Sequence, residues 1–299
     1  MKPALSETNA RAPLARKRGR NTVRHQQTHR RRIQSLMNDL LKSSLSSSLL
    51  RRQARASLQA CLALLALVVS LCLAPNEVSA QKRITEKYPV RNNVRLHLNN
   101  RSGTITVEAW NRNEIKIVVE MESPNARFSP QVNAEGLFID VVRDNRGRPD
   151  VGDVNFKINV PVNSMVDLET RRGNITVRGV EGSMMRAHVT SEGDIELTGI
   201  RSSTVMAGNT VGNIVFDAEL MRGGIYELQS LQGDISIRIT ANSGFRLMGL
   251  GPKINLGEFG ARGEFQFYGA RRKVIGKVGE GGATLNVNNQ FGTITFMPR

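Results

Sequence analysis

A repeat of about 20 residues in the last 125 positions is the feature that most constrains the fold of this 299-residue chain. The repeat is marked by β-branched residues at intervals of 20, 19, 21, 19, 20 and 20 positions: Ile175, Ile195, Ile214, Ile235, Ile254, Val274 and Ile294. We call these the marker positions. The position two residues before the marker, called here the Gly position, holds Gly in five copies but Pro252 and Arg272 in the other two. A fixed period of this length is typical of stacked repeat architectures.

Each copy contains two short apolar alternations separated by a small polar residue. In one copy, Val166 and Leu168 form the first alternation, Thr170 is the small residue, and Ile175 opens the second. An earlier copy of the same unit begins at Leu96. The pattern predicts strand, turn and strand in every copy. In the copy around residues 187–189 the first alternation is displaced by one residue, which predicts a β-bulge.

These copies predict an all-β chain built as a parallel β-solenoid, or β-helix, with coils of about 20 residues. Each coil would stack on the one before it, so like residues would form columns and the seven markers would follow one another in order. Less regular strands are expected near residues 114–122, 137–142 and 154–160. An antiparallel sandwich or roll is the alternative, although it does not require a constant interval between glycines.

The first 80 residues differ from the rest in charge and hydropathy. They carry 14 Lys and Arg against 3 Asp and Glu, whereas residues 81–299 carry 28 against 23. An apolar run at 60–74 follows three arginines and precedes a small-x-small sequence, which predicts a signal peptide over 51–80 with cleavage between Ala80 and Gln81. A single membrane anchor through residues 58–74 is the alternative. Cys61 and Cys72 both lie in this run, so no disulfide is expected in the folded part.

Residues 1–50 are interpreted as a basic disordered extension, or as the product of a start assigned upstream of Met37. As a cytoplasmic tail, the extension would contact anionic lipid head groups or nucleic acid. It holds no aromatic residue for base stacking, which disfavours nucleic acid. The basic character of the whole chain resides mostly in this leader, so no nucleic-acid partner is expected for the folded part.

The repeats resemble a known family. The segments NRSGTITVEAW (100–110), RRGNITVRGVEG (171–182), SEGDIELTGI (191–200) and LQGDISIRI (231–239) are similar to bacterial β-strand-repeat domains described as putative adhesins. The resemblance covers residues 88–299, which we take as one domain. It implies an exported envelope protein of unestablished biochemical function, and it is specific for architecture rather than for activity.

Metal, cofactor and nucleophile chemistry is not expected. The folded part has two histidines, His97 and His188, with no evident partners and no cysteine, so neither a zinc site nor a cofactor site is predicted. Asn and Asp follow the Gly position in four copies, which predicts a ladder of Asx turns and leaves a calcium column as the alternative. No GxSxG motif is present.

Clustered carboxylates are the one enzymatic hypothesis. A glycosidase needs two carboxyl groups about 5–9 Å apart, and adjacent coils would bring outward carboxylates near that range. The candidates are Asp167, Glu169, Glu192, Asp194 and Glu196. Solvated outer faces carry such residues for solubility, so we predict no catalytic residues and no enzymatic activity.

Two basic clusters form the candidate binding surface. They are Arg171 with Arg172, and Arg271 with Arg272 and Lys273. Both precede the second strand of a copy, so five regular coils would place them on one edge, about 24 Å apart. An anionic envelope polysaccharide or lipid is the partner that this edge would fit.

Together these features predict a non-enzymatic, exported envelope protein that serves as an adhesin or envelope-interaction module. Its location would be the periplasm, the cell surface or the medium. The alternatives are a membrane-tethered periplasmic scaffold or envelope-stress accessory protein, and a polysaccharide-acting enzyme.

Overall fold

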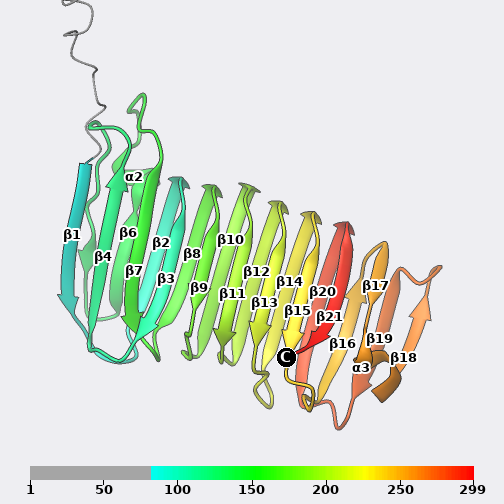
Figure 1. Ribbon diagram of the computed structural model, residues 1–299. Helices are drawn as coiled ribbons and strands as arrows, with labels where there is room; N and C mark the ends of the chain where they lie inside the picture. The colour runs from blue at the N-terminus through cyan, green and yellow to red at the C-terminus, as the bar shows by residue number, and fades with distance from the viewer. Residues whose placement is uncertain (1–81) are drawn as a thin grey trace, which may run out of the picture. The chain divides into compact units, whose positions relative to one another are not determined.

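The computed structural model describes residues 82–299, which form two β-sheets and two short helices (Figure 1). One sheet contains six of the seven marker positions and is called the marker sheet. Its ten strands follow the order β1-β4-β7-β3-β9-β11-β13-β15-β21-β17. The other, called the first-strand sheet, has eleven strands in the order β18-β19-β16-β20-β14-β12-β10-β8-β2-β6-β5. The prediction of an all-β chain is confirmed for these residues.

The marker sheet consists of β1 (Lys82–Pro89), β3 (Ile105–Trp110), β4 (Glu114–Met121), β7 (Val154–Pro161), β9 (Ile175–Arg178), β11 (Ile195–Ile200), β13 (Ile214–Ala218), β15 (Ile235–Ile239), β17 (Lys253–Asn255) and β21 (Thr293–Pro298). The first-strand sheet consists of β2 (Arg95–Ser102), β5 (Gln131–Val132), β6 (Gly136–Asp140), β8 (Met165–Arg172), β10 (Met184–Glu192), β12 (Thr204–Val211), β14 (Ile225–Gln232), β16 (Phe245–Leu250), β18 (Gly263–Tyr268), β19 (Lys273–Val278) and β20 (Ala283–Phe291). The helices are α2 (Val141–Asp144) and α3 (Glu258–Arg262).

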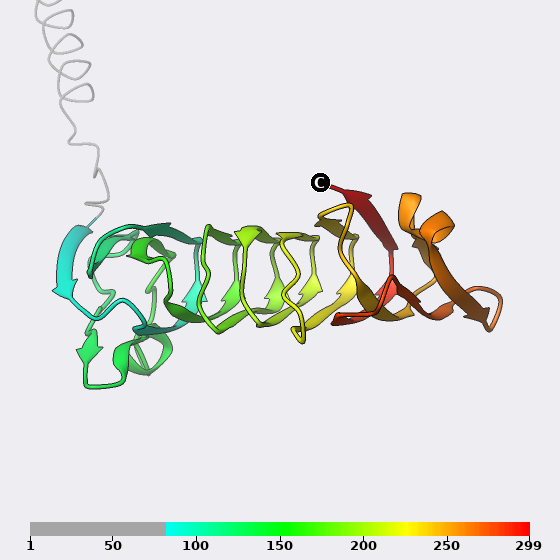
Figure 2. The ribbon, with the colours of Figure 1, turned by 90° about the horizontal axis from the view of Figure 1, so that it is seen from below.

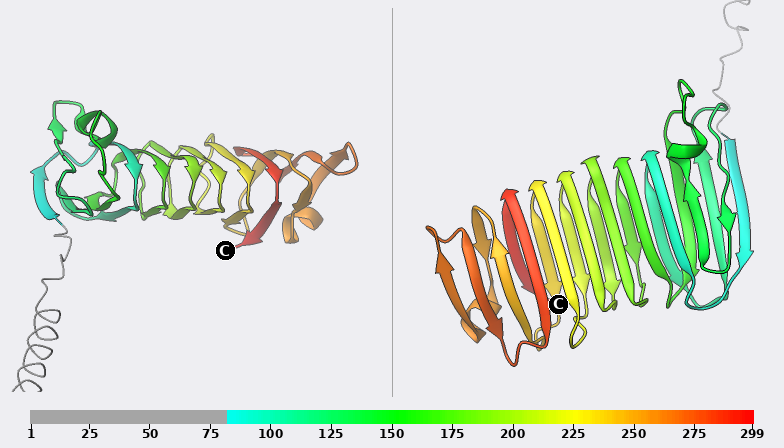
Figure 3. Two further views of the ribbon diagram at one scale, coloured as in Figure 1. Left: turned by 90° about the horizontal axis from the view of Figure 1, so that it is seen from above. Right: turned by 180° about the vertical axis from the view of Figure 1, so that it is seen from behind.

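Each central repeat contributes one strand to each sheet, and like strands pair in parallel. Ile175, Ile195, Ile214 and Ile235 are direct register partners in the marker sheet. They are fully buried, because alternate residues of both sheets point into the space between the two layers. Burying each such side chain stabilises the fold by about 1.5–3 kcal/mol. The two layers and the turns that join them are visible from below and above (Figures 2 and 3).

The corner between the two strands of a repeat requires Gly. Gly212 has a φ of +133°, and a Cβ there would lie 2.3 Å from the carbonyl oxygen of Gly193 in the neighbouring copy. Neither the dihedral angle nor the space admits another residue without strain. The predicted bulge is also present, as a register shift between Val189 and Glu192.

A ladder of side-chain hydrogen bonds runs along the outside of this corner. The backbone N–H of Asp194 donates to Asn174 Oδ1 at 2.9 Å, and the N–H of Asn213 donates to Asp194 Oδ1 at 2.7 Å. Asp234 N–H donates to Asn213 Oδ1, and Thr293 N–H donates to Asp234 Oδ1. The predicted Asx ladder is confirmed for these copies, and its oxygens accept backbone donors.

The order of the last copies was predicted wrongly. Ile235 pairs with Ile294 rather than with Ile254, and Ile254 pairs with the other side of Ile294. Val274 leaves the marker column, since it pairs with Gly249 of the antiparallel strand β16. The C-terminal strands β20 and β21 are thus inserted between β14/β15 and β16/β17 (Figure 1).

The corner geometry explains this insertion. A Cβ on the residue that stacks over Gly233 would lie 1.9 Å from the carbonyl oxygen of Gly233. Gly292 meets this requirement, whereas Pro252 and Arg272 occupy the Gly position of their copies with a side chain. The copy that ends the chain therefore stacks directly on β15.

Antiparallel pairing occurs at the two ends of the sheets. At one end β4 pairs antiparallel with β1 and β7, and at the other β19 pairs antiparallel with β16 and β18. The predicted strands near residues 114–122, 137–142 and 154–160 correspond to β4, β6 and β7. Helix α3 lies after β17 and buries Phe259 against Phe245.

Within residues 82–299, no helix is long and apolar enough to cross a membrane. The basic extension, the apolar run at 60–74, Cys61, Cys72 and the cleavage site at Ala80 and Gln81 lie outside the described residues, so their interpretation stays a prediction.

Candidate functional site

Two of the candidate carboxylates belong to an ion-pair network on the outer face of the first-strand sheet. Arg186 Nη1 donates to Asp167 Oδ1 at 2.9 Å, and Arg186 Nη2 donates to Glu169 Oε2 at 3.0 Å. Burial lowers the pKa of Arg186 and is the largest single influence, but the hydrogen bonds and charges of Asp167 and Glu169 together raise that pKa above its ordinary value. The guanidinium of Arg186 therefore forms ion pairs with the carboxylates of both Asp167 and Glu169.

His97 joins the same network, contrary to the expectation that it has no partner. Its Nδ1 lies 3.1 Å from Asp167 Oδ2, because register pairing of β2 with β8 sets His97 beside Asp167. His188 is the register partner of Glu169 on the other side of β8. Within residues 82–299, no group of three His, Cys, Asp or Glu side chains is arranged to hold a metal ion.

The remaining candidate carboxylates are elsewhere. Asp194 belongs to the Asx ladder at the corner. Glu196 lies in the marker sheet, in the layer opposite Asp167, and its Oε1 is 3.3 Å from Arg178 Nη2. Glu192 ends β10, beside Arg172. The structure does not bring the five candidates together as one catalytic pair or cluster.

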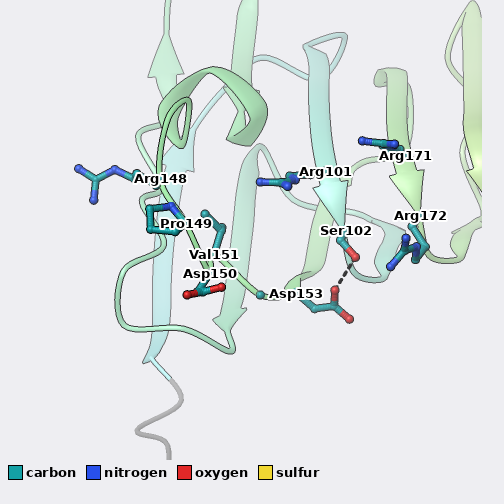
Figure 4. A pocket seen from close by; sticks show the side chains of 10 residues that line it. Arg101, Ser102, Arg148, Pro149, Asp150, Val151, Asp153, Arg171 and Arg172 are labelled. Atoms are coloured by element: carbon teal, nitrogen blue, oxygen red, sulfur yellow. Dashed lines mark hydrogen bonds between the residues drawn. The ribbon is translucent and has the colours of Figure 1, made fainter.

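The first basic cluster lines a pocket at the carboxyl ends of strands β2 and β8 of the first-strand sheet. Arg171 and Arg172 end β8, and Arg101 occupies the equivalent place on β2, because Asn100 pairs with Thr170 and Ser102 with Arg172. The pocket has a volume of about 370 Å³. Figure 4 shows Arg101, Arg171 and Arg172 at the ends of neighbouring strands. We call these three residues the arginine corner.

The arginine corner is exposed and unpaired. Its three guanidinium groups make no ion pair or hydrogen bond with other residues of 82–299, in contrast to Arg178, Arg186 and Arg201, which pair with carboxylates. Three like charges at neighbouring strand ends repel one another and create a field that favours an anion.

The facing wall of the pocket comes from the loop before β7. It supplies Arg148, Asp150 and Asp153. Asp153 accepts a hydrogen bond from the Ser102 hydroxyl (Figure 4). Asp150 has a φ of +52° and an exposed side chain. The site therefore combines anion-binding guanidinium groups with carboxylates that accept hydrogen bonds from hydroxyl groups.

The second basic cluster lies in the turn between β18 and β19 and at the first residue of β19. The guanidinium of Arg271 stacks over the ring of Phe267, 4.6 Å from its centroid. Arg272 accepts a backbone hydrogen bond from Gly251, and Lys273 pairs with Leu250. Six strand intervals separate β8 from β19, or about 29 Å, rather than the five expected. Both clusters lie at the same edge, because Lys273 pairs with Leu250 at the carboxyl end of β16, and Arg172 is at the carboxyl end of β8, which runs parallel to β16.

Sequence reasoning missed Arg101, Arg148, Asp150 and Asp153. Arg101 was visible in principle, because NRSG at 100–103 aligns with TRRG at 170–173. The other three come from an irregular loop outside the repeat pattern, so spacing could not place them.

The chain was compared with known protein families, curated proteins and solved structures. No family model matches the chain, and no curated protein matches it. Among solved structures, a putative cell adhesion protein from Clostridium sporogenes is 15% identical, with a TM-score of 0.44; the match covers 73% of this chain and 100% of that one. A putative adhesin from Bacteroides fragilis is 12% identical, with a TM-score of 0.36 and coverage of 73% and 99%.

Proposed function

We propose that this chain is an exported, non-enzymatic protein of the cell envelope and that residues 88–299 form a β-solenoid acting as an adhesin or envelope-interaction module. The observation that carries the proposal is the arginine corner, with three unpaired guanidinium groups beside a pocket. Export rests on the leader predicted over residues 51–80.

The ligand that fits the arginine corner is an anionic envelope polysaccharide or lipid. Each guanidinium offers five N–H donors in a plane that matches carboxylate, sulfate and phosphate groups. The carboxylates of Asp150 and Asp153 on the facing wall would repel a bare anion, but they accept hydrogen bonds from hydroxyl groups. A sugar polymer that carries both hydroxyl and anionic groups matches both walls, so a polysaccharide is the favoured source of the anion.

The test compares the full chain with the variant R101A/R171A/R172A. Binding to immobilised dextran sulfate is measured at about 0.1 M salt, with uncharged dextran as the blank. We expect binding to weaken by about tenfold or more, since each lost charge-assisted contact contributes roughly 0.5–1 kcal/mol at an exposed site. Vesicles with and without anionic phosphatidylglycerol form a second arm, which distinguishes a lipid from a polysaccharide.

A matched control removes the same charge elsewhere. Arg91, Arg127 and Arg238 are exposed, and their side chains make no ion pair within residues 82–299. The variant R91A/R127A/R238A therefore has the same net charge as the site variant, and it keeps any contribution of the basic leader. Equal losses in the two variants would mean that net charge alone binds the polymer, and the proposed site would be rejected.

Location is tested on cells. The mass of the N-terminus of the native protein distinguishes cleavage before Gln81 from retention of residues 58–74. Protease treatment of intact cells then separates a surface protein from one enclosed in the periplasm. A retained anchor together with complete protection from protease would favour a tethered periplasmic scaffold over an adhesin.

A further inference from the structure

The two sheets have four edge strands, and one of them differs from the other three. The edges of the marker sheet are β1 and β17, and those of the first-strand sheet are β5 and β18. An edge strand presents unpaired N–H and C=O groups, so proteins guard edges with short strands, lysines or proline. β17 has three residues and β5 has two. β1 reads KRITEKYP, with three cationic residues and a terminal proline.

Strand β18 has none of these protections. It reads GEFQFY over six residues, with one charge, no lysine and no proline. On one side it pairs with β19, and within residues 82–299 no strand pairs with its other side. Figure 1 shows β18 as the last strand at its end of the sheet.

Four of the twelve exposed large apolar side chains of residues 82–299 lie at the same end. On the outer face of the first-strand sheet, Met248, Leu250, Tyr268 and Ile275 are 50%, 48%, 47% and 41% exposed. They come from β16, β18 and β19, which are neighbours in the sheet. Exposed apolar side chains, here interspersed with Arg246, Lys273 and Lys277, beside an unprotected edge are typical of a surface at which another polypeptide docks.

We propose that β18 pairs antiparallel with β18 of a second copy of this chain, which gives a two-fold dimer with a continuous first-strand sheet. The sequence of β18 is complementary to itself in this arrangement. With Gln266 on the axis, Glu264 lies opposite Tyr268 and Phe265 lies opposite Phe267 of the other copy.

The burial pattern supports this register. Glu264, Gln266 and Tyr268 are exposed on one face of β18, while Phe265 and Phe267 are half-buried on the other. Pairing about Gln266 joins exposed residues to exposed residues and aromatic residues to aromatic residues, and such cross-strand pairs stabilise sheets. A two-fold axis closes the assembly, because each copy uses the same edge.

The dimer would give the molecule two arginine corners, one in each half. This consequence rests on the proposed function, whereas the dimer itself does not. Two linked sites raise the apparent affinity for a repeating polymer without any new contact.

The experiment measures the mass of the full chain in solution by light scattering, at concentrations from about 1 to about 200 µM. The wild-type chain is expected to shift from monomer to dimer within this range. The variant Q266K sets two lysines against each other on the axis, and Q266E sets two glutamates; both are expected to remain monomeric. A mixture of Q266K and Q266E is expected to recover the dimer, since opposite charges then meet.

The control is Q229K, in which an exposed Gln in the middle of the sheet on β14 receives the same substitution. It is expected to dimerise like wild type. A wild-type chain that stays monomeric throughout, a Q266K variant that dimerises normally, or a mixture that remains monomeric would each overturn the proposal. None of these measurements depends on an anionic ligand, so failure of the dimer and failure of the proposed function are separable.

Discussion

The insertion of β20 and β21 can be tested by cross-linking across the marker sheet. Ser236 on β15 is the register partner of Thr295 on β21, and Asn255 on β17 pairs with the other side of Thr295. Neighbouring strands are about 4.8 Å apart, so Ser236 is about 4.8 Å from Thr295 and about 9.6 Å from Asn255. A disulfide requires Cα atoms roughly 4.4–6.8 Å apart. The pair S236C/T295C therefore meets the distance requirement, and the pair S236C/N255C does not.

The disulfide should also stabilise the fold measurably. It closes a loop of about 60 residues, for which the chain-entropy relation gives about 4 kcal/mol at 25 °C before any strain is subtracted. Both pairs are made in a background with Cys61→Ser and Cys72→Ser, oxidised mildly, and examined by peptide mass spectrometry and urea unfolding.

We expect near-complete cross-linking and a raised urea midpoint for S236C/T295C only. Efficient cross-linking of S236C/N255C, with S236C/T295C remaining reduced, would refute the insertion and restore the simple succession of coils.

Three further predictions concern stability. Phe216→Ala should lower the free energy of unfolding by about 3–5 kcal/mol in urea titrations, because the ring is fully buried against Tyr226; a loss below about 1 kcal/mol would contradict tight packing there. Gly212→Ala should cost at least about 1–3 kcal/mol from backbone strain alone, in addition to the clash with the neighbouring carbonyl, and an unchanged midpoint would argue against the corner geometry. Burial raises the pKa of the Tyr226 hydroxyl, so its contribution to stability is complete below about pH 10 and is lost as the pH rises through the folded-state pKa. Tyr226→Phe should therefore flatten the decline in stability above about pH 10, and an identical decline in both proteins would refute this assignment.

The local structure could be predicted from the sequence because each position of the repeat has one physical requirement. The Gly at the corner provides the positive φ. The Asn or Asp after it accepts a hydrogen bond from a backbone N–H of the next copy. The alternating apolar residues form a strand with one buried and one exposed face. These requirements are local to a copy, so the structure of each copy can be predicted from its sequence without knowing which copies are neighbours.

The order of stacking could not be predicted from spacing, because spacing does not say which copy lies next to which. The departures at Pro252 and Arg272 were the available signal, since neither can stand over the carbonyl of Gly233. The partner of His97 was missed for a related reason. His97 and Asp167 are 70 residues apart, yet β2 pairs directly with β8 and β3 with β9, while β4 to β7 lie beyond β2 and β3 toward the end of each sheet.

The late position of β20 and β21 in the chain also affects the order in which the molecule can fold. Among the described residues, β16 and β17 attach to the sheets of the preceding repeats only through β20 and β21, which are synthesised after them. The segment from β16 to β19 must therefore wait for β20 and β21 to be synthesised before it can dock. Docking of this segment therefore cannot follow the order of synthesis, in contrast to the strands from β8 to β15, each of which pairs with a strand made before it.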